Sequence, residues 1–276
     1  MMRLGLLLSP YRNLTTLCCA ALSLHPHMQV MNHGFARIES QGGLRFITDQ
    51  SAENLERFRQ MLIDMSAGGR QGDHGGSIIY SHAFEQDGVK EAYQRLIGDV
   101  QIKPDIRAVV WKEGGRLREY LKEQGISPLQ LASRFDDLCF ISPVRNLLDH
   151  AYGLQKFYRT IGLQSYVQSS LPDLEIGSIL RYIIACHAEF WTHAQTMPER
   201  FFIFAESEMG GDVLSRLGRF LGVADEPAWI AQTAPLFVSK VHYEHTPADR
   251  ALLARIVAEG QTYSREFLDF IGVPGE

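Results

Sequence analysis

The chain has 276 residues, of which 45% are hydrophobic, and its formal net charge is −5 at pH 7. This length and composition allow one sizeable hydrophobic core, so we expect a single domain over residues 1–276. The acidic balance excludes a general nucleic-acid binder, because such a protein needs a basic face for the phosphate backbone.

The first residues contain a short apolar run that could open a signal peptide. The run Leu4–Leu8 is followed by Ser9-Pro10, which breaks it where an h-region would continue. No stretch approaches the roughly 18 uncharged apolar residues of a membrane span. Four cysteines have neither zinc-type spacing nor the density of a disulfide framework: Cys18, Cys19, Cys139 and Cys186. We therefore expect a cytoplasmic, soluble protein with no transmembrane segment and with reduced thiols.

Short apolar runs that predict β-strands alternate with longer segments of helical periodicity. The strands are expected at Arg3–Leu8, Met28–Met31, Ser77–Ser81, Ile106–Lys112, Leu138–Ser142 and Arg200–Ala205. The helices are expected at 14–24, 51–65, 88–98, 114–123, 127–134, 147–160, 175–196, 212–221 and, near the C-terminus, 249–271. Nearly continuous apolar strands are typical of parallel strands that are covered on both faces. The alternation predicts an α/β, three-layer sandwich with a central parallel sheet.

The turn after the first strand, YRNLTT at residues 11–16, has the composition of an anion-binding loop. In a parallel α/β sheet this turn is the favoured anion site, because free N–H groups and the helix dipole meet the ligand there. The groups that would bind the anion are the backbone N–H groups of Asn13 and Leu14, the hydroxyls of Thr15 and Thr16, and the guanidinium of Arg12. A capped helix with Arg12 on the surface explains the same residues equally well.

The turn lacks the glycine-rich loop and the Lys-Ser/Thr pair that Walker-type triphosphate binding requires. An arginine and two threonines without a magnesium anchor suit a single phosphate beside a leaving group, so ATP is the less favoured ligand. The histidines do not have the spacing of a zinc site, and no metal is expected.

Three blocks of the chain together resemble the family of sulfotransferases that use 3′-phosphoadenosine-5′-phosphosulfate (PAPS). The first block is YRNLTTL at residues 11–17, which is similar to the Pro-Arg-Ser-Gly-Thr-Thr loop; HP at residues 25–26 follows, as in many carbohydrate and tyrosyl-protein members. The second is LCFISPVRNLLDHAYG at 138–153, and the third is RFFIFAESEMGGDVLSRLGRFLGV at 200–223. The resemblance spans residues 3 to about 223. It implies a P-loop NTPase-like fold with helical additions and PAPS as co-substrate.

The resemblance also implies roles for individual residues in donor binding. Arg12, Thr15 and Thr16 would hold the 5′-phosphate, while Arg145 would bind the 3′-phosphate through its guanidinium fork. Ser239 and Lys240 lie in a short Ser-Lys-Val element that contacts donor phosphates in tyrosyl-protein members, although a plain loop explains them as well.

The chain departs from the family pattern at several positions of the donor site. Leu14 replaces the loop glycine, Asn13 replaces a serine, Leu147 replaces a proline, and Gly153 replaces the serine that would also contact the 3′-phosphate. These departures keep a non-catalytic or degenerate nucleotide-binding homologue open as an alternative.

The reaction also needs a base, and two histidines are candidates. His33 occupies the position where some members carry a glutamate after the second strand, and an unperturbed histidine pKa of about 6.5 suits a general base. His82 is the second candidate, expected at the end of a strand. Lys112 and Glu113, at the end of another expected strand, contact either the ligand or solvent.

The most favoured function is in-line transfer of a sulfuryl group from PAPS to an acceptor hydroxyl, with a histidine as general base. The acceptor could be a small molecule, a carbohydrate, a lipid or a peptide. Residues 45–75 and 160–200 are expected to form its binding site, and the glycine-rich stretch 68–76 is either a rim of the pocket or a plain connection. A P-loop kinase is the other alternative, and the oligomeric state is not predicted.

Overall fold

A six-stranded sheet forms the centre of the molecule in the computed structural model, which describes residues 2–68, 75–85, 88–161, 171–260 and 263–273. The strands are β1 (Arg3–Leu7), β2 (Met28–Asn32), β3 (Gly76–Ser77), β4 (Ala108–Lys112), β5 (Leu138–Val144) and β6 (Phe201–Ala205). Their order is β3-β2-β4-β1-β5-β6, and all neighbouring pairs are parallel except β2 with β3. The predicted α/β architecture is confirmed, with one antiparallel edge strand.

Thirteen α-helices surround the sheet within the described residues. They are α1 (Thr15–Ser23), α2 (Phe35–Ser40), α3 (Arg45–Asp49), α4 (Ala52–Ser66), α5 (Val89–Leu96), α6 (Gly115–Glu123), α7 (Pro128–Arg134), α8 (Leu147–Ile161), α9 (Ile176–Thr196), α10 (Gly211–Phe220), α11 (Pro227–Thr233), α12 (Pro247–Glu259) and α13 (Arg265–Phe270).

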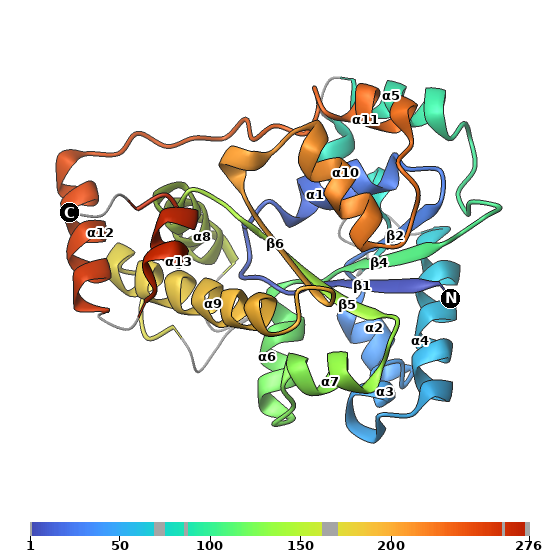
Figure 1. Ribbon diagram of the computed structural model, residues 1–276, viewed down its shortest axis with the longest axis horizontal. Helices are drawn as coiled ribbons and strands as arrows, with labels where there is room; N and C mark the ends of the chain where they lie inside the picture. Colours follow the sequence, from blue (N-terminus) through green and yellow to red (C-terminus); the bar gives the residue numbers. More distant parts are fainter. Residues whose placement is uncertain (1, 69–74, 86–87, 162–170, 261–262, 274–276) are drawn as a thin grey trace.

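Helices cover both faces of the sheet and give the molecule three layers (Figure 1). The strands are buried along almost their whole length, as their apolar sequences require, because the sheet is covered on both sides. One hydrophobic cluster joins the sheet to α1, α5, α10 and α11, and a second joins it to α2, α3, α4, α6 and α7. The fold is therefore the P-loop-like, three-layer sandwich expected from the alternation of elements.

A third hydrophobic cluster lies beyond the end of the sheet, where α8, α9, α12 and α13 pack together. The carboxyl end of β1 points toward this group of helices in Figure 1. The segment that joins α11 to α12 runs along the upper side of the same view. Elements from distant parts of the chain thus meet at the carboxyl edge of the sheet, which is where α/β proteins bind ligands.

The expected strand at Ser77–Ser81 is wrong for most of its length. Only Gly76–Ser77 pairs with β2, and a 3₁₀-helix follows at Ile78–Tyr80. His82 consequently begins a second 3₁₀-helix, His82–Glu85, rather than ending a strand. A short apolar run does not distinguish a strand from a buried helical turn, since both bury consecutive side chains.

Other differences concern helix boundaries and short helices. The expected C-terminal helix is two helices, α12 and α13, because α12 ends at Gly260 and Ser264 caps the next one through its side chain. Helices α2, α3 and α11, of five to seven residues each, have no counterpart among the helices predicted from the sequence. Most of the glycine-rich stretch 68–76 lies outside the described residues.

Two composition-based expectations can be compared with the structure. All four cysteines are free and buried, as expected. None of the described helices is long and apolar enough to cross a membrane.

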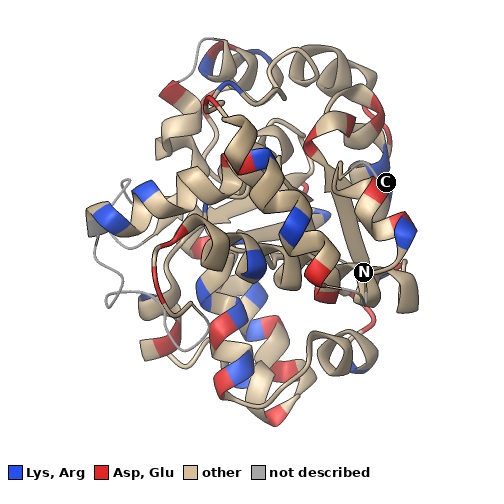
Figure 2. Cartoon of the chain, turned by 90° about the vertical axis from the view of Figure 1, so that its left-hand side faces the viewer, with Lys and Arg blue, Asp and Glu red and all other residues tan. Residues whose placement is uncertain are grey.

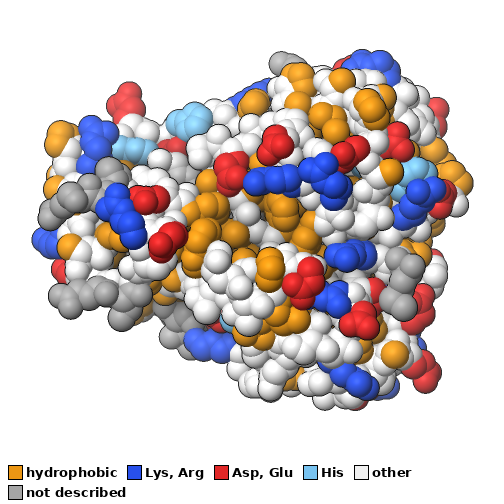
Figure 3. Space-filling model, viewed as in Figure 1, with side chains coloured by type: hydrophobic (Ala, Val, Ile, Leu, Met, Phe, Trp, Pro, Cys, Tyr) orange, Lys and Arg blue, Asp and Glu red, His pale blue; other side chains and the backbone are white. Residues whose placement is uncertain are grey.

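Basic and acidic positions are interspersed on the side of the molecule drawn in Figure 2, while hydrophobic side chains gather in the middle of the face drawn in Figure 3.

Candidate functional site

A pocket of about 540 Å³ lies at the carboxyl edge of the sheet, between the turn after β1 and the ends of β2 and β4. Its lining includes nine residues singled out from the sequence for donor binding or catalysis: Arg12, Leu14, Thr15, Thr16, His33, His82, Arg145, Ser239 and Lys240. Two residues from the same set, Asn13 and Gly153, do not line it. Residues that are far apart in the chain therefore meet in one cavity.

The turn after β1 adopts the shape of a glycine-rich loop without containing a glycine. Arg12 and Leu14 both have positive backbone φ angles, of 64° and 58°. Side chains other than glycine rarely adopt this left-handed conformation, which costs roughly 1–2 kcal/mol per residue. Leu14 is also the N-cap of α1, so the helix begins directly at the pocket and no acidic residue stands in its first turn. The backbone shape that glycine would favour is kept with Leu14 in its place.

Asn13 fixes this turn against the other arginine-bearing segment. Its side chain is completely buried, donates to the Pro143 carbonyl and accepts from the Arg145 backbone N–H at 2.9 Å. The sequence suggested a backbone contact with an anion for Asn13, whereas the structure uses its amide as a clamp between β1–α1 and β5–α8. Because of this clamp, Arg12 and Arg145 occupy the same pocket.

Arg145 is buried, with only 5% of its surface exposed, so it is not an ordinary surface arginine. One terminal nitrogen donates to the Val241 carbonyl, the guanidinium lies 5.9 Å from the Tyr243 ring, and Nε has no hydrogen-bond partner among the described residues. A Cβ atom at Gly153 would come within 3.1 Å of Nη1. Gly153 therefore leaves room for this guanidinium rather than contacting a ligand itself.

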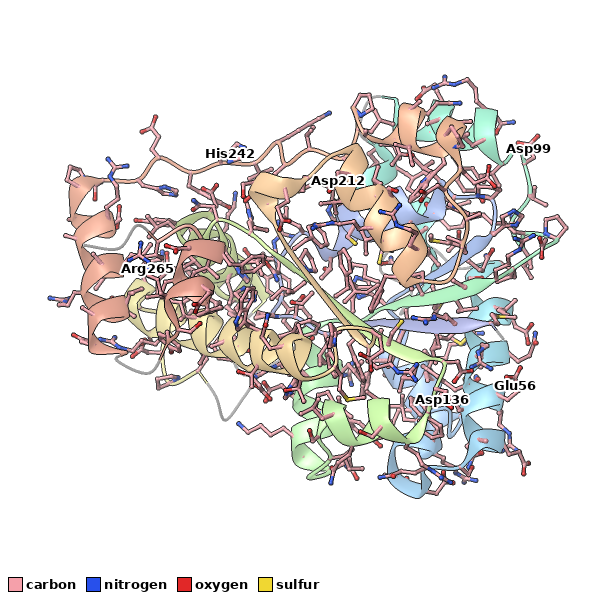
Figure 4. All side chains as sticks on the ribbon, viewed as in Figure 1. Glu56, Asp99, Asp136, Asp212, His242 and Arg265 are labelled. Carbon is pink, nitrogen blue, oxygen red and sulfur yellow. The ribbon has the colours of Figure 1, made fainter. Side chains whose placement is uncertain are left out.

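One wall of the pocket is an extended segment, residues 237–246, which we call the strap. It carries Ser239 and Lys240. Buried Asp149 holds the strap through His242 Nδ1 at 2.9 Å, His245 Nε2 at 3.0 Å and the Tyr243 backbone N–H at 2.7 Å. Figure 4 labels His242 on this segment.

The opposite wall contains His33, which follows β2 and also has a positive φ, of 57°. Its backbone N–H donates to the Lys112 carbonyl at 3.0 Å, and its carbonyl accepts from Trp111 Nε1 at 2.7 Å. The end of β4 thus holds the strained conformation in place. Strained residues of this kind cluster at functional sites, and three of the four non-glycine residues with positive φ among the described residues line this pocket.

Lys112 and Glu113 flank the His33 ring. Lys112 Nζ lies 2.9 Å from Nε2, and Glu113 Oε2 lies 4.0 Å from Nδ1. Because the ammonium donates to Nε2, the neutral ring carries its proton on Nδ1, toward Glu113. Partial burial and, next, the Lys112 charge lower the pKa of His33 to about 3. His33 is therefore neutral at physiological pH, but with so low a pKa it is a weak proton acceptor while the Lys112 ammonium stays at Nε2.

Lys112 and Glu113 are both buried, so the alternative of a solvated helix start is wrong for them. Burial lowers the pKa of Lys112 and raises the pKa of Glu113. His82 lines the same pocket, and burial followed by the charges of Lys112 and Arg12 lowers its pKa. Both candidate bases line the same pocket. Of the two, only His33 has both its backbone N–H and its backbone carbonyl hydrogen-bonded to residues of β4.

The pocket is strongly basic. Five of its side chains are arginine or lysine: Arg12, Lys112, Arg116, Arg145 and Lys240. None of the five forms an ion pair with a described Asp or Glu, and Glu113 is the only carboxyl group in the lining. Unneutralised cations together with the start of α1 make the pocket suited to a ligand with several negative charges.

The sequence did not identify three features of this site. These are the clamp through the Asn13 side chain, the strap anchor at Asp149, and Arg116. The only feature of the sequence that points to Arg116 is its position close to the end of an apolar strand. The other two contacts join residues more than ninety positions apart, which no local pattern reveals.

A second cavity, of about 790 Å³, lies between α6, α7 and α9 and contains none of the residues predicted for the site. Segment 160–200, expected to help form the acceptor site, contributes α9 to this second cavity, and Gly75 is the one described residue of segment 45–75 that lines the basic pocket. The place of the acceptor stays a prediction. Within the described residues there is no group of three or more His, Cys, Asp or Glu side chains that could hold a metal ion.

No protein-family model matches the chain, and no curated protein matches it in sequence. Among solved structures, the chain is similar to the "Sulfotransferase Domain from the Synechococcus PCC 7002 Olefin Synthase", with 14% identity and a TM-score of 0.38 over 98% of this chain and 93% of that one. A likeness of this degree says nothing about activity. Fold and pocket define a P-loop-like α/β protein with a strongly basic pocket at the carboxyl edge of its sheet.

Proposed function

We propose that the protein is a sulfotransferase that moves a sulfuryl group from PAPS to an acceptor hydroxyl. The observation that supports this most is the pairing of Arg12 with Arg145 in one pocket, through the buried Asn13 side chain. PAPS carries phosphate groups at both ends of its ribose, so it needs two separate cationic contacts at a fixed spacing. A ligand with a single phosphate group would leave one of the two guanidinium groups unused.

Five side chains of the pocket have roles in donor binding in the proposed reaction. Arg12, the hydroxyls of Thr15 and Thr16, and the first N–H groups of α1 hold the 5′-phosphate and stabilise the charge that develops on it as it leaves. Arg145 binds the 3′-phosphate, and Lys240 on the strap adds a second positive charge beside it.

The proposed base is His33, whose backbone is held at the pocket by β4. The S–O bond to the 5′-phosphate breaks as the new S–O bond to the acceptor forms, and adenosine 3′,5′-bisphosphate leaves. The acceptor O–H bond breaks in the same step, and its proton goes to the Nε2 lone pair of His33. In the structure that lone pair accepts from Lys112 Nζ. The transfer therefore requires Lys112 to leave Nε2, and the negatively charged donor in the same pocket supplies the attraction for this movement.

The test is to incubate the protein with PAPS and hydroxyl acceptors from the four classes considered, and to measure the adenosine 3′,5′-bisphosphate formed. We expect turnover with at least one class and none with ATP and magnesium in place of PAPS. Bisphosphate binding without turnover in any class would favour the non-catalytic homologue. Magnesium-dependent ATP turnover would favour the kinase.

A further inference from the structure

Arg116 is a charged residue of the pocket that donor binding does not explain. It is the second residue of α6 and lines the pocket on the side of His33. Its guanidinium lies 4.5 Å from the centre of the Phe35 ring, and Phe35 follows His33 by two positions. Arg12 and Arg145 belong instead to the segments that Asn13 clamps together after β1 and β5.

The position of Arg116 is unfavourable for the chain alone. The start of a helix carries a partial positive charge, and an acidic residue there would be stabilising, yet the first turn of α6 contains none. Arg116 forms no hydrogen bond or ion pair with any described residue; it lies over the face of Phe35 and interacts with Glu113 only electrostatically, beyond ion-pair distance. A cation in this position is stabilised when it meets an anion from outside the chain.

The neighbouring Glu113 does not supply that anion. It forms no ion pair with Arg116, one of its oxygens accepts from the Phe35 backbone N–H, and the other has no hydrogen-bond partner among the described residues. Burial raises the pKa of Glu113, which favours the uncharged acid. Arg116 and the first N–H groups of α6 thus present positive charge next to the proposed base.

We propose that Arg116 binds a carboxylate of the acceptor, beside the hydroxyl that receives the sulfuryl group. A guanidinium fork that lies over an aromatic ring suits the two oxygens of a carboxylate. The inference rests on the proposed function and adds the substrate class: the acceptor is a hydroxy acid, and its carboxylate sets the position of the hydroxyl near His33 Nε2.

The experiment offers each acceptor class as a matched pair, the free acid and its primary amide. The pairs are hydroxyphenylacetate, N-acetyltyrosine, glucuronate and hydroxydodecanoate, each with its amide. The readout is kcat/KM for the bisphosphate formed from PAPS, in the wild type and in the variants Arg116→Gln, Arg116→Lys and Arg118→Gln. Arg118 is the matched control, because it stands on the same helix but pairs with Glu189 and lines the other cavity.

For the acceptor that is turned over, we expect the acid to exceed the amide by at least about tenfold, which is the value of one charge-assisted hydrogen bond. Arg116→Gln should abolish this preference by lowering kcat/KM for the acid alone, Arg116→Lys should restore part of it, and Arg118→Gln should leave it unchanged. The affinity for adenosine 3′,5′-bisphosphate should change less than about twofold in every variant, because none of them contacts the donor.

Three results would overturn the inference. The first is equal turnover of acid and amide by the wild type. The second is a preference for the acid that survives in Arg116→Gln. The third is a large loss of bisphosphate affinity in Arg116→Gln, which would assign Arg116 to the donor while leaving the proposed function intact. Absence of turnover with all pairs, in a protein that binds the bisphosphate, would reject the proposed function and this inference with it.

Discussion

The larger cavity beside α9 and the basic pocket differ in how their charges are balanced. The larger one, between α6, α7 and α9, contains Arg118 and Arg181, which pair with Glu189 and Glu259. The smaller one, at the carboxyl edge of the sheet, contains five cations that pair with no described carboxylate. Both arginines of the larger cavity are therefore already paired with carboxylates of the chain, so neither of them requires a charged ligand.

This difference shows that the size of a cavity does not identify the functional site here. Unpaired charge is costly to hold in a cavity, and so is the strained backbone of Arg12, Leu14 and His33. Both costs are concentrated around the smaller pocket. A protein can retain unpaired charge and backbone strain in a pocket when a ligand of opposite charge offsets their free-energy cost. The difference between the two cavities leads to the predictions below.

The largest effect is expected at the base. His33→Ala should lower kcat for sulfuryl transfer by about two to four orders of magnitude, because no base then takes the proton from the substrate hydroxyl. The affinity for the bisphosphate should change little. His193→Ala, in the larger cavity, is the matched control and should keep kcat within about twofold. If His82→Ala reduces kcat and His33→Ala does not, the assignment of the base is wrong.

The next effect concerns the donor. Arg145→Ala should weaken the binding of adenosine 3′,5′-bisphosphate by about 10- to 100-fold, because charge-assisted hydrogen bonds to the 3′-phosphate are lost. Arg181→Ala removes an arginine of the same charge from the larger cavity and should have no effect. Titration calorimetry measures both. Equal losses of bisphosphate affinity in Arg145→Ala and Arg181→Ala would contradict the proposed difference between the two cavities.

Two buried histidines behind the pocket should make stability depend on pH. His150 donates from Nε2 to the Tyr11 carbonyl, and His187 on α9 lies next to it with both ring nitrogens unpartnered among the described residues. Burial lowers the pKa of His150 to about 3 and lowers that of His187 as well. The unfolded chain therefore binds protons that the folded chain rejects, and stability falls as the pH drops below about 6.5.

The variant His187→Leu isolates one of these groups. Each such histidine lowers the free energy of unfolding by about 2 kcal/mol when the pH falls from 7 to 5. Over the same pH range, His187→Leu should therefore lose about 2 kcal/mol less than the wild type. Urea denaturation at the two pH values measures the difference. Wild type and variant would show the same dependence on pH if the His187 ring were protonated in the folded protein.

The smallest effect is expected from relieving strain in the turn. Leu14→Gly should stabilise the protein by about 1 kcal/mol or less, because the gain at a positive φ is partly offset by the greater freedom of glycine in the unfolded chain. Gln50→Gly is the matched control, since Gln50 has a φ of 50° outside the pocket. Only Leu14→Gly should also change bisphosphate affinity, which calorimetry would detect. A loss of stability in Leu14→Gly would show that its side-chain contacts outweigh the backbone strain.

The sequence predicted the sheet well because β1, β4 and β5 are continuous apolar runs, a pattern that long buried strands share. It predicted the strand at Ser77–Ser81 wrongly, since a short apolar run carries no information on whether its backbone pairs. Because Leu14 replaces the loop glycine of the family pattern, the sequence suggested a loop that binds phosphate less well. The backbone nevertheless adopts the glycine conformation, because the Asn13 clamp and the bond from His150 to the Tyr11 carbonyl hold the turn.

Other parts of the site could not be read from sequence. Whether Arg145 is buried or exposed depends on the strap, which lies about one hundred residues further along the chain and is fixed by the Asp149 side chain. The contact between Lys112 and His33 depends on the register of β2 against β4. Such contacts follow from the assembled sheet rather than from any local pattern.

The most direct measurement is a calorimetric titration of the wild-type protein with adenosine 3′,5′-bisphosphate and, separately, with adenosine 5′-monophosphate. A pocket with cations for both phosphate groups predicts micromolar or tighter binding of the bisphosphate, about −8 kcal/mol, and at least about tenfold weaker binding of the monophosphate. Equal affinities for the two nucleotides, or no binding of the bisphosphate at millimolar concentration, would contradict the account.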